Sequence, residues 1–275
     1  MEKETTATVG DAYPPHEIAR KVEHLGVAKA HTTAVTLLVL AGLAGAFISF
    51  GALFFTVAIT GSQLGFGVTR VIGGACFSLG LILVVVAGAE LFTGNNLIAM
   101  AWASRLIGTR EVVRNWLLAY VGNVVGCLIT VLITLWCGVA GLGGGAVGQT
   151  AVRIASVKAD LPLVEAFTRG ILCNTLVCLA VWLAIGARSV TDKILAIIFP
   201  ITAFVAIGLE HSIANWFFLP FGLALDESGA VSVIGATRNI LAVSAGNIVG
   251  GTLLVAGVYW IAYLRPERQG GPRAS

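Results

Sequence analysis

Charged residues are scarce in this sequence. Asp, Glu, Lys and Arg make up 11% of its 275 residues, whereas hydrophobic residues make up 57%. Soluble globular domains carry about 25% charged residues, so the composition excludes an ordinary soluble domain. The few cations form no basic stripe, and nucleic acid is therefore not an expected partner. The sequence predicts an integral membrane protein surrounded by lipid.

Motifs for metal, cofactor and enzyme chemistry are also missing. All five cysteines fall in apolar runs, with no C-x-x-C pair and no histidine at ligand spacing. We therefore expect no disulfide, no metal and no cofactor. Without H-E-x-x-H or G-x-S-x-G, a membrane-embedded enzyme that uses His211 with Thr93 or Lys158 is a disfavoured alternative. The glycine-rich stretch at 141–149 lacks GK[ST] and is expected to be a flexible loop rather than a phosphate site.

Long runs without charge define the membrane spans. They cover residues 32–69, 71–89, 91–104, 115–152, 170–187, 194–209, 212–225 and 239–264. About 20 apolar residues cross a bilayer as a helix, so four runs span alone and two pairs form spans interrupted at Glu90 and Glu210. The sequence predicts an all-α membrane protein with six transmembrane helices, of which the second and fifth are broken.

The two ends of the chain are more polar. Residues 1–32 lack the apolar centre of a secretory signal, and the segment from Pro15 has Ile18, Val22 and Leu25 on one helical face. We predict an amphipathic helix that lies on the membrane, with a solvated turn as the alternative. Residues 33–264 form the six-helix transmembrane domain, and residues 265–275 form a tail.

Basic residues near the spans indicate the orientation, because cytoplasmic loops are enriched in Lys and Arg. One side carries Lys3, Arg20, Lys21, Lys29, Arg105, Arg110, Arg114, Arg188, Lys193, Arg265, Arg268 and Arg273. The opposite loops hold only Arg70, Arg153, Lys158 and Arg238. Both termini are therefore predicted to be cytoplasmic.

Two pairs of similar segments indicate an internal repeat. GAELFTGN (88–95) and GLEHSIAN (208–215) share G-x-E-x-x-x-x-N, and GNVVG (122–126) matches GNIVG (246–250). Three helices per half, with both termini on one side, require the halves to be inverted. Inverted repeats with broken helices at matching positions are typical of a transport site near the bilayer midplane. The glycines of the second pair, Gly122, Gly126, Gly246 and Gly250, are expected to allow close helix packing.

The breaks contain the residues that could carry chemistry. His211 is the only histidine inside the spans, which favours a functional role, and Thr93 could reach the same permeant with its hydroxyl group. Half-helix N-termini at the breaks would favour an anion. Glu90 and Glu210 could instead cap the half-helices or pair with buried amides. Lys158 is expected at the outer mouth, either attracting anions or as an ordinary juxtamembrane lysine.

Four segments resemble the formate/nitrite transporter family, and its formate channels in particular. They are CFSLGLIL (76–83), AELFTG (89–94), LCNTLVCLAVW (172–182) and EHSIANW (210–216). The similarity extends over about residues 15–266. It implies an aquaporin-like six-helix protomer, a homopentamer with a separate pore in each subunit, and a place in a bacterial-type inner (plasma) membrane.

The resemblance also implies roles for individual residues. His211 would be the central pore histidine, with Thr93, Asn174 and Asn215 as permeant-binding partners and Lys158 as the cation of the outer vestibule. One hydrophobic constriction would contain Phe77 and Phe204. A second, on the cytoplasmic side, would contain Leu81, Leu91, Phe92 and Val177.

A histidine between apolar constrictions suggests a proton-exchange mechanism. Stripping an isolated ion of water costs tens of kcal/mol in the idealised limit. The ordinary pKa values of histidine and a carboxylic acid differ by about 2.5 units, so moving a proton from His⁺ to the anion costs about 3.4 kcal/mol. We therefore hypothesise that His211 lends a proton to formate, with Thr93 orienting it. Nitrite is the main alternative, followed by bicarbonate, lactate and hydrosulfide; a pure assembly subunit would not need the histidine.

Overall fold

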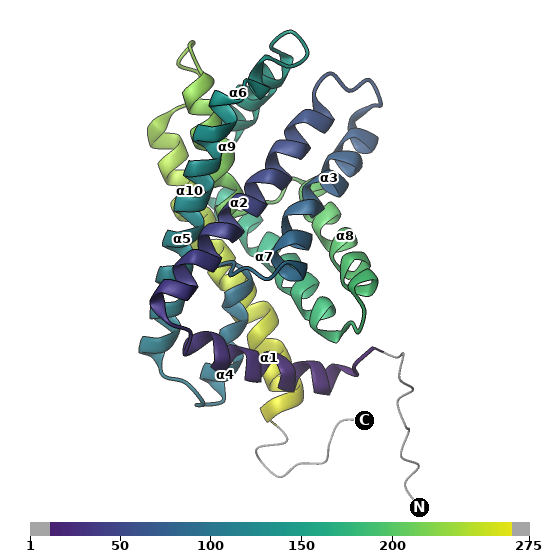
Figure 1. Cartoon of the computed structure of the whole chain (residues 1–275), viewed down its shortest axis with the longest axis vertical. Coiled ribbons are helices and arrows are strands. Elements are labelled where there is room, and N and C mark those ends of the chain that lie inside the picture. Colours follow the sequence, from purple (N-terminus) through teal and green to yellow (C-terminus); the bar gives the residue numbers. More distant parts are fainter. Residues whose placement is uncertain (1–11, 266–275) are drawn as a thin grey trace, which may run out of the picture.

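The structure is a computed structural model, and it describes residues 12–265. The predictions about Lys3, Arg268, Arg273 and the tail beyond Arg265 lie outside this range. Throughout residues 12–265 the regular structure is entirely helical. The helices run along one long axis, except for the N-terminal helix, which lies across one end (Figure 1).

Among residues 12–265, six helices are long and apolar enough to cross a membrane. They are α2 (Ala34–Ile59), α3 (Phe66–Val86), α5 (Thr109–Trp136), α7 (Leu163–Gly186), α8 (Val190–Ile207) and the last helix (Val233–Leu264), which comprises α10 (Val233–Val249), η3 (Gly250–Gly257) and η4 (Trp260–Leu264). The protein is therefore a multi-pass membrane protein, and the predicted all-α fold with six apolar spans is confirmed.

Two of these helices stop early and continue after a break. After α3 the chain resumes as η1 (Gly94–Ile98) and α4 (Ala99–Ala103), and after α8 it resumes as α9 (Ser212–Leu225). The resumed segments are too short to cross alone, so each completes the span that precedes it. These are the broken second and fifth spans that the sequence predicts.

Glycines bring the long helices into backbone contact. A Cβ atom on Gly126 of α5 would lie 2.0 Å from the carbonyl oxygen of Gly42 in α2, and one on Gly250 would lie 2.1 Å from that of Ile171 in α7. A Cβ atom on Gly122 would lie 2.5 Å from its nearest neighbouring atom, and one on Gly246 would lie 2.1 Å from its nearest. The predicted packing role of these glycines is confirmed.

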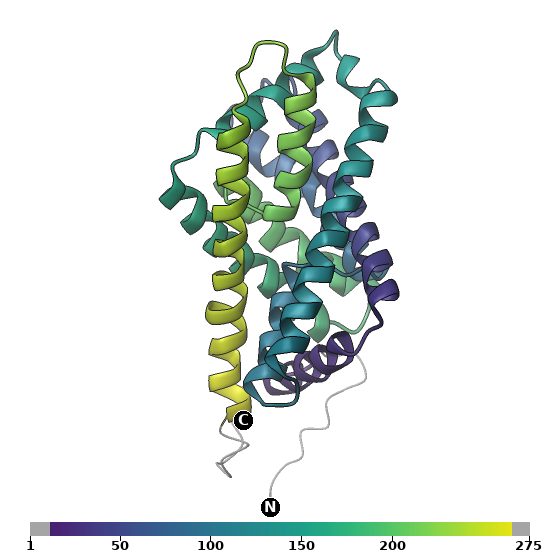
Figure 2. The same cartoon turned by 90° about the vertical axis from the view of Figure 1, so that its left-hand side faces the viewer.

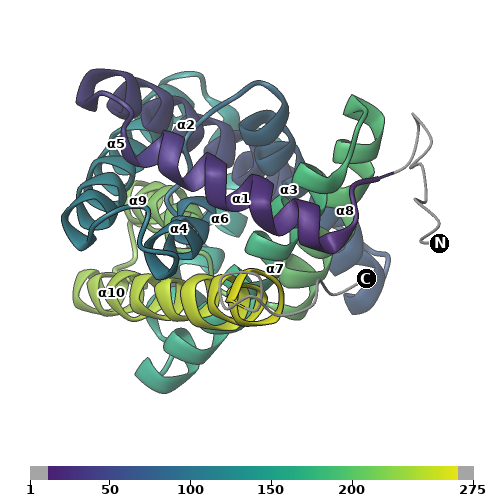
Figure 3. The same cartoon turned by 90° about the horizontal axis from the view of Figure 1, so that it is seen from below.

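Helix α1 (Pro15–Ala30) crosses the end of the bundle (Figure 3). Ile18 and Val22 are buried against the protein, in a cluster with residues of α7 and the last helix. The prediction that α1 lies on the membrane is therefore wrong in one respect, because its apolar face is covered by protein rather than left for lipid. Leu25, the third residue assigned to that face, is 44% exposed. Helix α1 and the end of the last helix lie at the same end of the molecule (Figure 2).

The glycine-rich stretch is only partly a loop. It begins in the short turn η2 (Val139–Gly141), and three successive glycines, Gly143–Gly145, have positive φ angles of 63°, 66° and 92°. Residues other than glycine rarely adopt a positive φ angle. Helix α6 (Ala146–Ala159) then follows and buries Val147, Ala151 and Ala155. This helix was not predicted, and it carries Lys158.

Candidate functional site: two broken helices and the cavities beside them

The two breaks have the same local geometry. Gly88 and Gly208 adopt positive φ angles of 83° and 85°, which turn the chain out of α3 and α8. The segments that follow bring Glu90 and Thr93 into one break, and Glu210 and His211 into the other. All four side chains are buried or partly buried.

Asn123 of α5 replaces the helical hydrogen bonds that the first break removes. Its Oδ1 accepts a bond from the backbone N–H of Phe92 at 2.9 Å. Its Nδ2 donates to the carbonyl oxygens of Ala41 at 2.8 Å and Glu90 at 2.9 Å. Buried backbone groups need such partners, because lipid supplies none.

Asn247 of the last helix does the same at the second break. Its Oδ1 accepts from the N–H of Ser212 at 2.9 Å. Its Nδ2 donates to the carbonyl oxygens of Gly170 at 2.8 Å and Glu210 at 3.0 Å. The bonds match those of the first break in number and kind, as the predicted inverted repeat would require.

Each break also contains a lysine–carboxylate pair. At the first, the Nζ of Lys29 in α1 lies 2.7 Å from both carboxylate oxygens of Glu90 and 3.0 Å from Asn95 Oδ1. Asn95 Nδ2 donates to Glu90 at 2.8 Å and to Asn115 Oδ1 at 2.9 Å. The carbonyl oxygen of Lys29 accepts in turn from Asn115 Nδ2. Hydrogen bonds to Asn95 and Asn115 thus hold both members of the ion pair in place.

The second pair is deeper. Lys158 Nζ lies 2.9 Å from Glu210 Oε1, and the side chains are 14% and 5% exposed. Asn215 Nδ2 donates to Glu210 Oε2 and to Asn239 Oδ1, both at 2.7 Å. The carbonyl oxygen of Lys158 accepts from Asn239 Nδ2. Lys158 is therefore built into the break through its ion pair, and Lys29 is its counterpart at the other end.

The breaks meet at Thr93 and His211. The Oγ1 of Thr93 lies 2.9 Å from the Nε2 of His211, and both residues are buried. The Nδ1 of His211 accepts the backbone N–H of Ala214 at 3.1 Å, so His211 is the N-cap of α9. Because Nδ1 is an acceptor here, a neutral ring carries its proton on Nε2 and donates it to Thr93. The structure thus brings the two predicted residues together.

The two other predicted amides lie in different surroundings. Asn174 donates to the carbonyl oxygens of Thr93 at 3.2 Å and Asn247 at 2.7 Å, and to Asn96 Oδ1 at 2.8 Å. It holds the first break in place and lines neither of the cavities described below. Asn215 does line a cavity, and its Oδ1 has no hydrogen-bond partner among residues 12–265.

A cavity lies on either side of this centre. The α6-side cavity has a volume of about 390 Å³, and its lining includes Lys158, His211, Phe77 and Phe204. The α1-side cavity has a volume of about 350 Å³, and its lining includes Lys29, with Leu81 and Leu91. The Thr93–His211 bond is thus flanked by two hollows, each with its own lysine.

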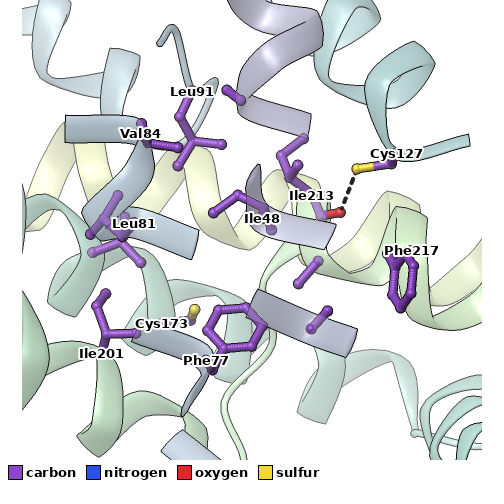
Figure 4. Close-up of a cluster of buried hydrophobic side chains, with 14 of the residues drawn as sticks. Ile48, Phe77, Leu81, Val84, Leu91, Cys127, Cys173, Ile201, Ile213 and Phe217 are labelled. Atoms are coloured by element: carbon purple, nitrogen blue, oxygen red, sulfur yellow. Dashed lines mark hydrogen bonds between the residues drawn. The ribbon is translucent and has the colours of Figure 1, made fainter. Parts of the chain in front are cut away.

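Apolar side chains separate the cavities. The rings of Phe77 and Phe204 meet edge to face, with centroids 5.5 Å apart. Phe77 and Leu81 lie about one turn apart along α3, and Leu91 follows beyond Leu81 (Figure 4). The two remaining predicted constriction residues, Phe92 and Val177, are buried but line neither cavity, and the ring of Phe92 packs on Tyr120 at 4.9 Å.

Sequence reasoning missed several residues of this site. In the sequence Lys29 reads as a basic residue of the amphipathic segment on the cytoplasmic side, and Asn123 and Asn247 stand beside glycines that indicate helix packing. The asparagines could have been found, because GN precedes two β-branched apolar residues and a glycine in both halves. Arg70 reads in the sequence as a loop charge, whereas its guanidinium donates to the carbonyl oxygens of Val205 and Ala206 at the end of α8.

Six apolar spans, two of them broken at matching places, with cavities on both sides of a buried polar centre, define the class of membrane transport proteins. The formate/nitrite transporter family model matches residues 16–261. The chain belongs to this family, which consists of transporters and channels rather than enzymes.

Individual relatives agree with the family match. The formate channel FocA of Escherichia coli (strain K12) is 39% identical, covering 93% of this chain and 96% of FocA. The formate channel BtFdhC of Bacillus thuringiensis is 36% identical, covering 91% of this chain and 96% of that protein.

Two solved structures have the same fold. A pentameric formate channel with formate bound is 40% identical, with a TM-score of 0.79, covering 84% of this chain and 98% of the other. An ion channel of the same family is 30% identical, with a TM-score of 0.83, covering 90% and 98%.

Proposed function

We propose that this protein lets a small monovalent anion, formate, cross the inner (plasma) membrane. The observation that carries this proposal is the buried Thr93–His211 hydrogen bond between two cavities on opposite sides of the centre. The relatives that are named as formate channels support the choice of formate. No specific feature of the site favours nitrite, which therefore becomes the competitor in the test.

Within this proposal, His211 exchanges a proton with the permeant. The anion meets Phe77 and Phe204 on one side of the centre and Leu81 and Leu91 on the other. If the permeant crosses these apolar constrictions as a neutral acid, most of the free-energy cost of dehydrating an ion is avoided. Placing a second proton on His211 would use Nδ1 and break its bond to Ala214. We therefore expect the charged ring to form only while an anion is close.

The two lysines support entry from either side. Each is paired with a carboxylate, so it places positive charge locally at a cavity while the pair as a whole leaves no uncompensated charge inside the protein. We assign the α6-side cavity with Lys158 to the outer vestibule and the α1-side cavity with Lys29 to the cytoplasmic one. Both termini are then cytoplasmic, and the matched contacts of the two breaks support an inverted repeat. The pentameric relative supports a homopentamer with a pore in each subunit.

The test is uptake of radiolabelled formate into proteoliposomes at several pH values, with nitrite as competitor. Asparagine is as good an N-cap as any residue, so His211→Asn removes the titrating group while keeping the start of α9. His211→Ala also removes the cap and should lower stability by about 0.5–2 kcal/mol. Comparing the two variants separates loss of the proton carrier from loss of the helix start.

We expect formate uptake by the parent protein to rise in acid, and His211→Asn to lose this pH response while keeping the N-cap of α9. Normal uptake by His211→Asn over the whole pH range would refute proton exchange. Absence of formate uptake, or its suppression by a small fraction of nitrite, would refute formate as the substrate and leave the family assignment unchanged.

A further inference from the structure

The charges of the two cavities differ. Among the residues that the structure describes, the α6-side cavity is lined by four basic side chains, Arg70, Arg153, Lys158 and Arg169, and by one carboxylate, Glu210. Its lining therefore has a net charge of +3 when Glu210 is ionised. The α1-side cavity is lined by one basic and one acidic side chain and is neutral. A formate ion carries one negative charge, so the α6-side cavity has more positive charge than formate requires.

Two of the arginines have a structural explanation. Arg70 donates to Val205 and Ala206, and Arg169 Nη1 reaches the carbonyl oxygen of Gly208 at 3.5 Å. Both therefore bind carbonyl oxygens at the C-terminal end of α8, where the helix dipole favours a positive charge. Arg169 also bonds to Glu165 at 2.7 Å. Their charges are partly balanced, but both remain in the lining of the cavity.

Arg153 has no such explanation. It lies on the exposed side of α6, five residues before Lys158 along the helix, and it lines the cavity. Within residues 12–265 it makes no hydrogen bond or ion pair. A guanidinium group offers planar, paired N–H donors that fit two oxygens of an oxyanion. Arg153 is therefore free to bind an anion at the cavity.

The cavity is also large enough for more than formate. Its volume of about 390 Å³ lies in the range of small-molecule sites, which is about 300–1,000 Å³. Phe77 and Phe204 are part of its lining. If His211 lends a single proton, a monovalent anion becomes neutral, but a divalent anion keeps one charge and cannot pass an apolar ring cheaply.

We propose that the α6-side cavity binds a divalent oxyanion of the sulfate type, which enters from that side, stops above Phe77 and Phe204 and blocks formate. This inference rests on the proposed function, because it uses the single proton of His211 to separate monovalent from divalent anions. The neutral α1-side cavity offers no equivalent site. Sulfate should therefore block formate passage from the α6 side of the membrane and not from the α1 side.

The experiment measures formate uptake into right-side-out and inside-out membrane vesicles, with sulfate outside and chloride of equal ionic strength as the control for screening. Three variants accompany the parent. Arg153→Gln removes the free guanidinium, Arg153→Glu reverses its charge, and Arg238→Gln removes an exposed arginine that does not line the cavity. Formate uptake without sulfate tests the proposed function and the folding of each variant separately.

We expect sulfate to inhibit uptake by right-side-out vesicles more than by inside-out vesicles. Arg153→Gln should raise the half-inhibitory sulfate concentration by about fivefold or more, since a close unit charge is lost, Arg153→Glu should abolish the inhibition, and Arg238→Gln should behave as the parent. Inhibition confined to inside-out vesicles would support the site and reverse the assigned orientation. Equal inhibition from both sides, no inhibition at all, or parental inhibition in Arg153→Gln would overturn the proposal while formate uptake stays normal.

Discussion

Asn123→Ala and Asn247→Ala test the idea that matched asparagines hold the two breaks together. Each substitution removes three hydrogen bonds of 2.8–3.0 Å to buried backbone groups. Interhelical hydrogen bonds in membrane proteins contribute about 0.6 kcal/mol on average and about 1.7 at most. The expected loss of stability is therefore about 2–5 kcal/mol for either variant.

The assay is denaturation of the purified protein in detergent, followed by loss of helical signal. Thr237→Ala is the control, because Thr237 is exposed on the same helix as Asn247 and its hydroxyl bonds only within that helix. It should change stability by less than about 0.5 kcal/mol. A cost below about 1 kcal/mol for either asparagine, less than the expected loss of three bonds, would refute the reasoning. A large difference between the two would contradict the equivalence of the halves.

Two further predictions concern packing and charge. Gly126→Ala places a Cβ atom against the backbone oxygen of Gly42, and the loss of stability should exceed the about 1–3 kcal/mol typical of overpacking. The control is Gly67→Ala, whose Cβ atom would meet nothing within 4 Å and which should be tolerated. Equal melting temperatures for the two variants would contradict this account. Glu210→Gln leaves the ammonium group of Lys158 largely buried without its carboxylate and should cost about 3–5 kcal/mol. Adding Lys158→Met should restore most of that loss, and an additive effect in thermal unfolding would show that the pair is not coupled.

The spans and their breaks could be predicted because both are local features of the sequence. Long runs without charge predict the helices, and a single carboxylate in each of two such runs predicts the breaks at Glu90 and Glu210. The partners of these carboxylates could not be predicted in the same way. Lys29 reaches Glu90 across 61 residues, and its helix reads as an amphipathic surface segment until the bundle end that covers it is known. Helix α6 was missed because the glycines before it indicate a loop and its buried side chains are small.

The same residues that repair the broken backbone also set the chemistry of the centre. His211 caps α9 through Nδ1, so its second nitrogen is free to donate and faces Thr93 in the opposite break. A histidine that capped no helix could rotate or take its proton on either nitrogen. The cap removes that freedom, because only the Nε2-protonated neutral form keeps the bond to Ala214. The broken helix thus orients the His211 ring, and Asn247, which holds the adjacent backbone of Ser212, maintains that orientation. For this reason Asn247→Ala should impair formate passage as well as stability, whereas a substitution that only loosens lipid-facing packing should not.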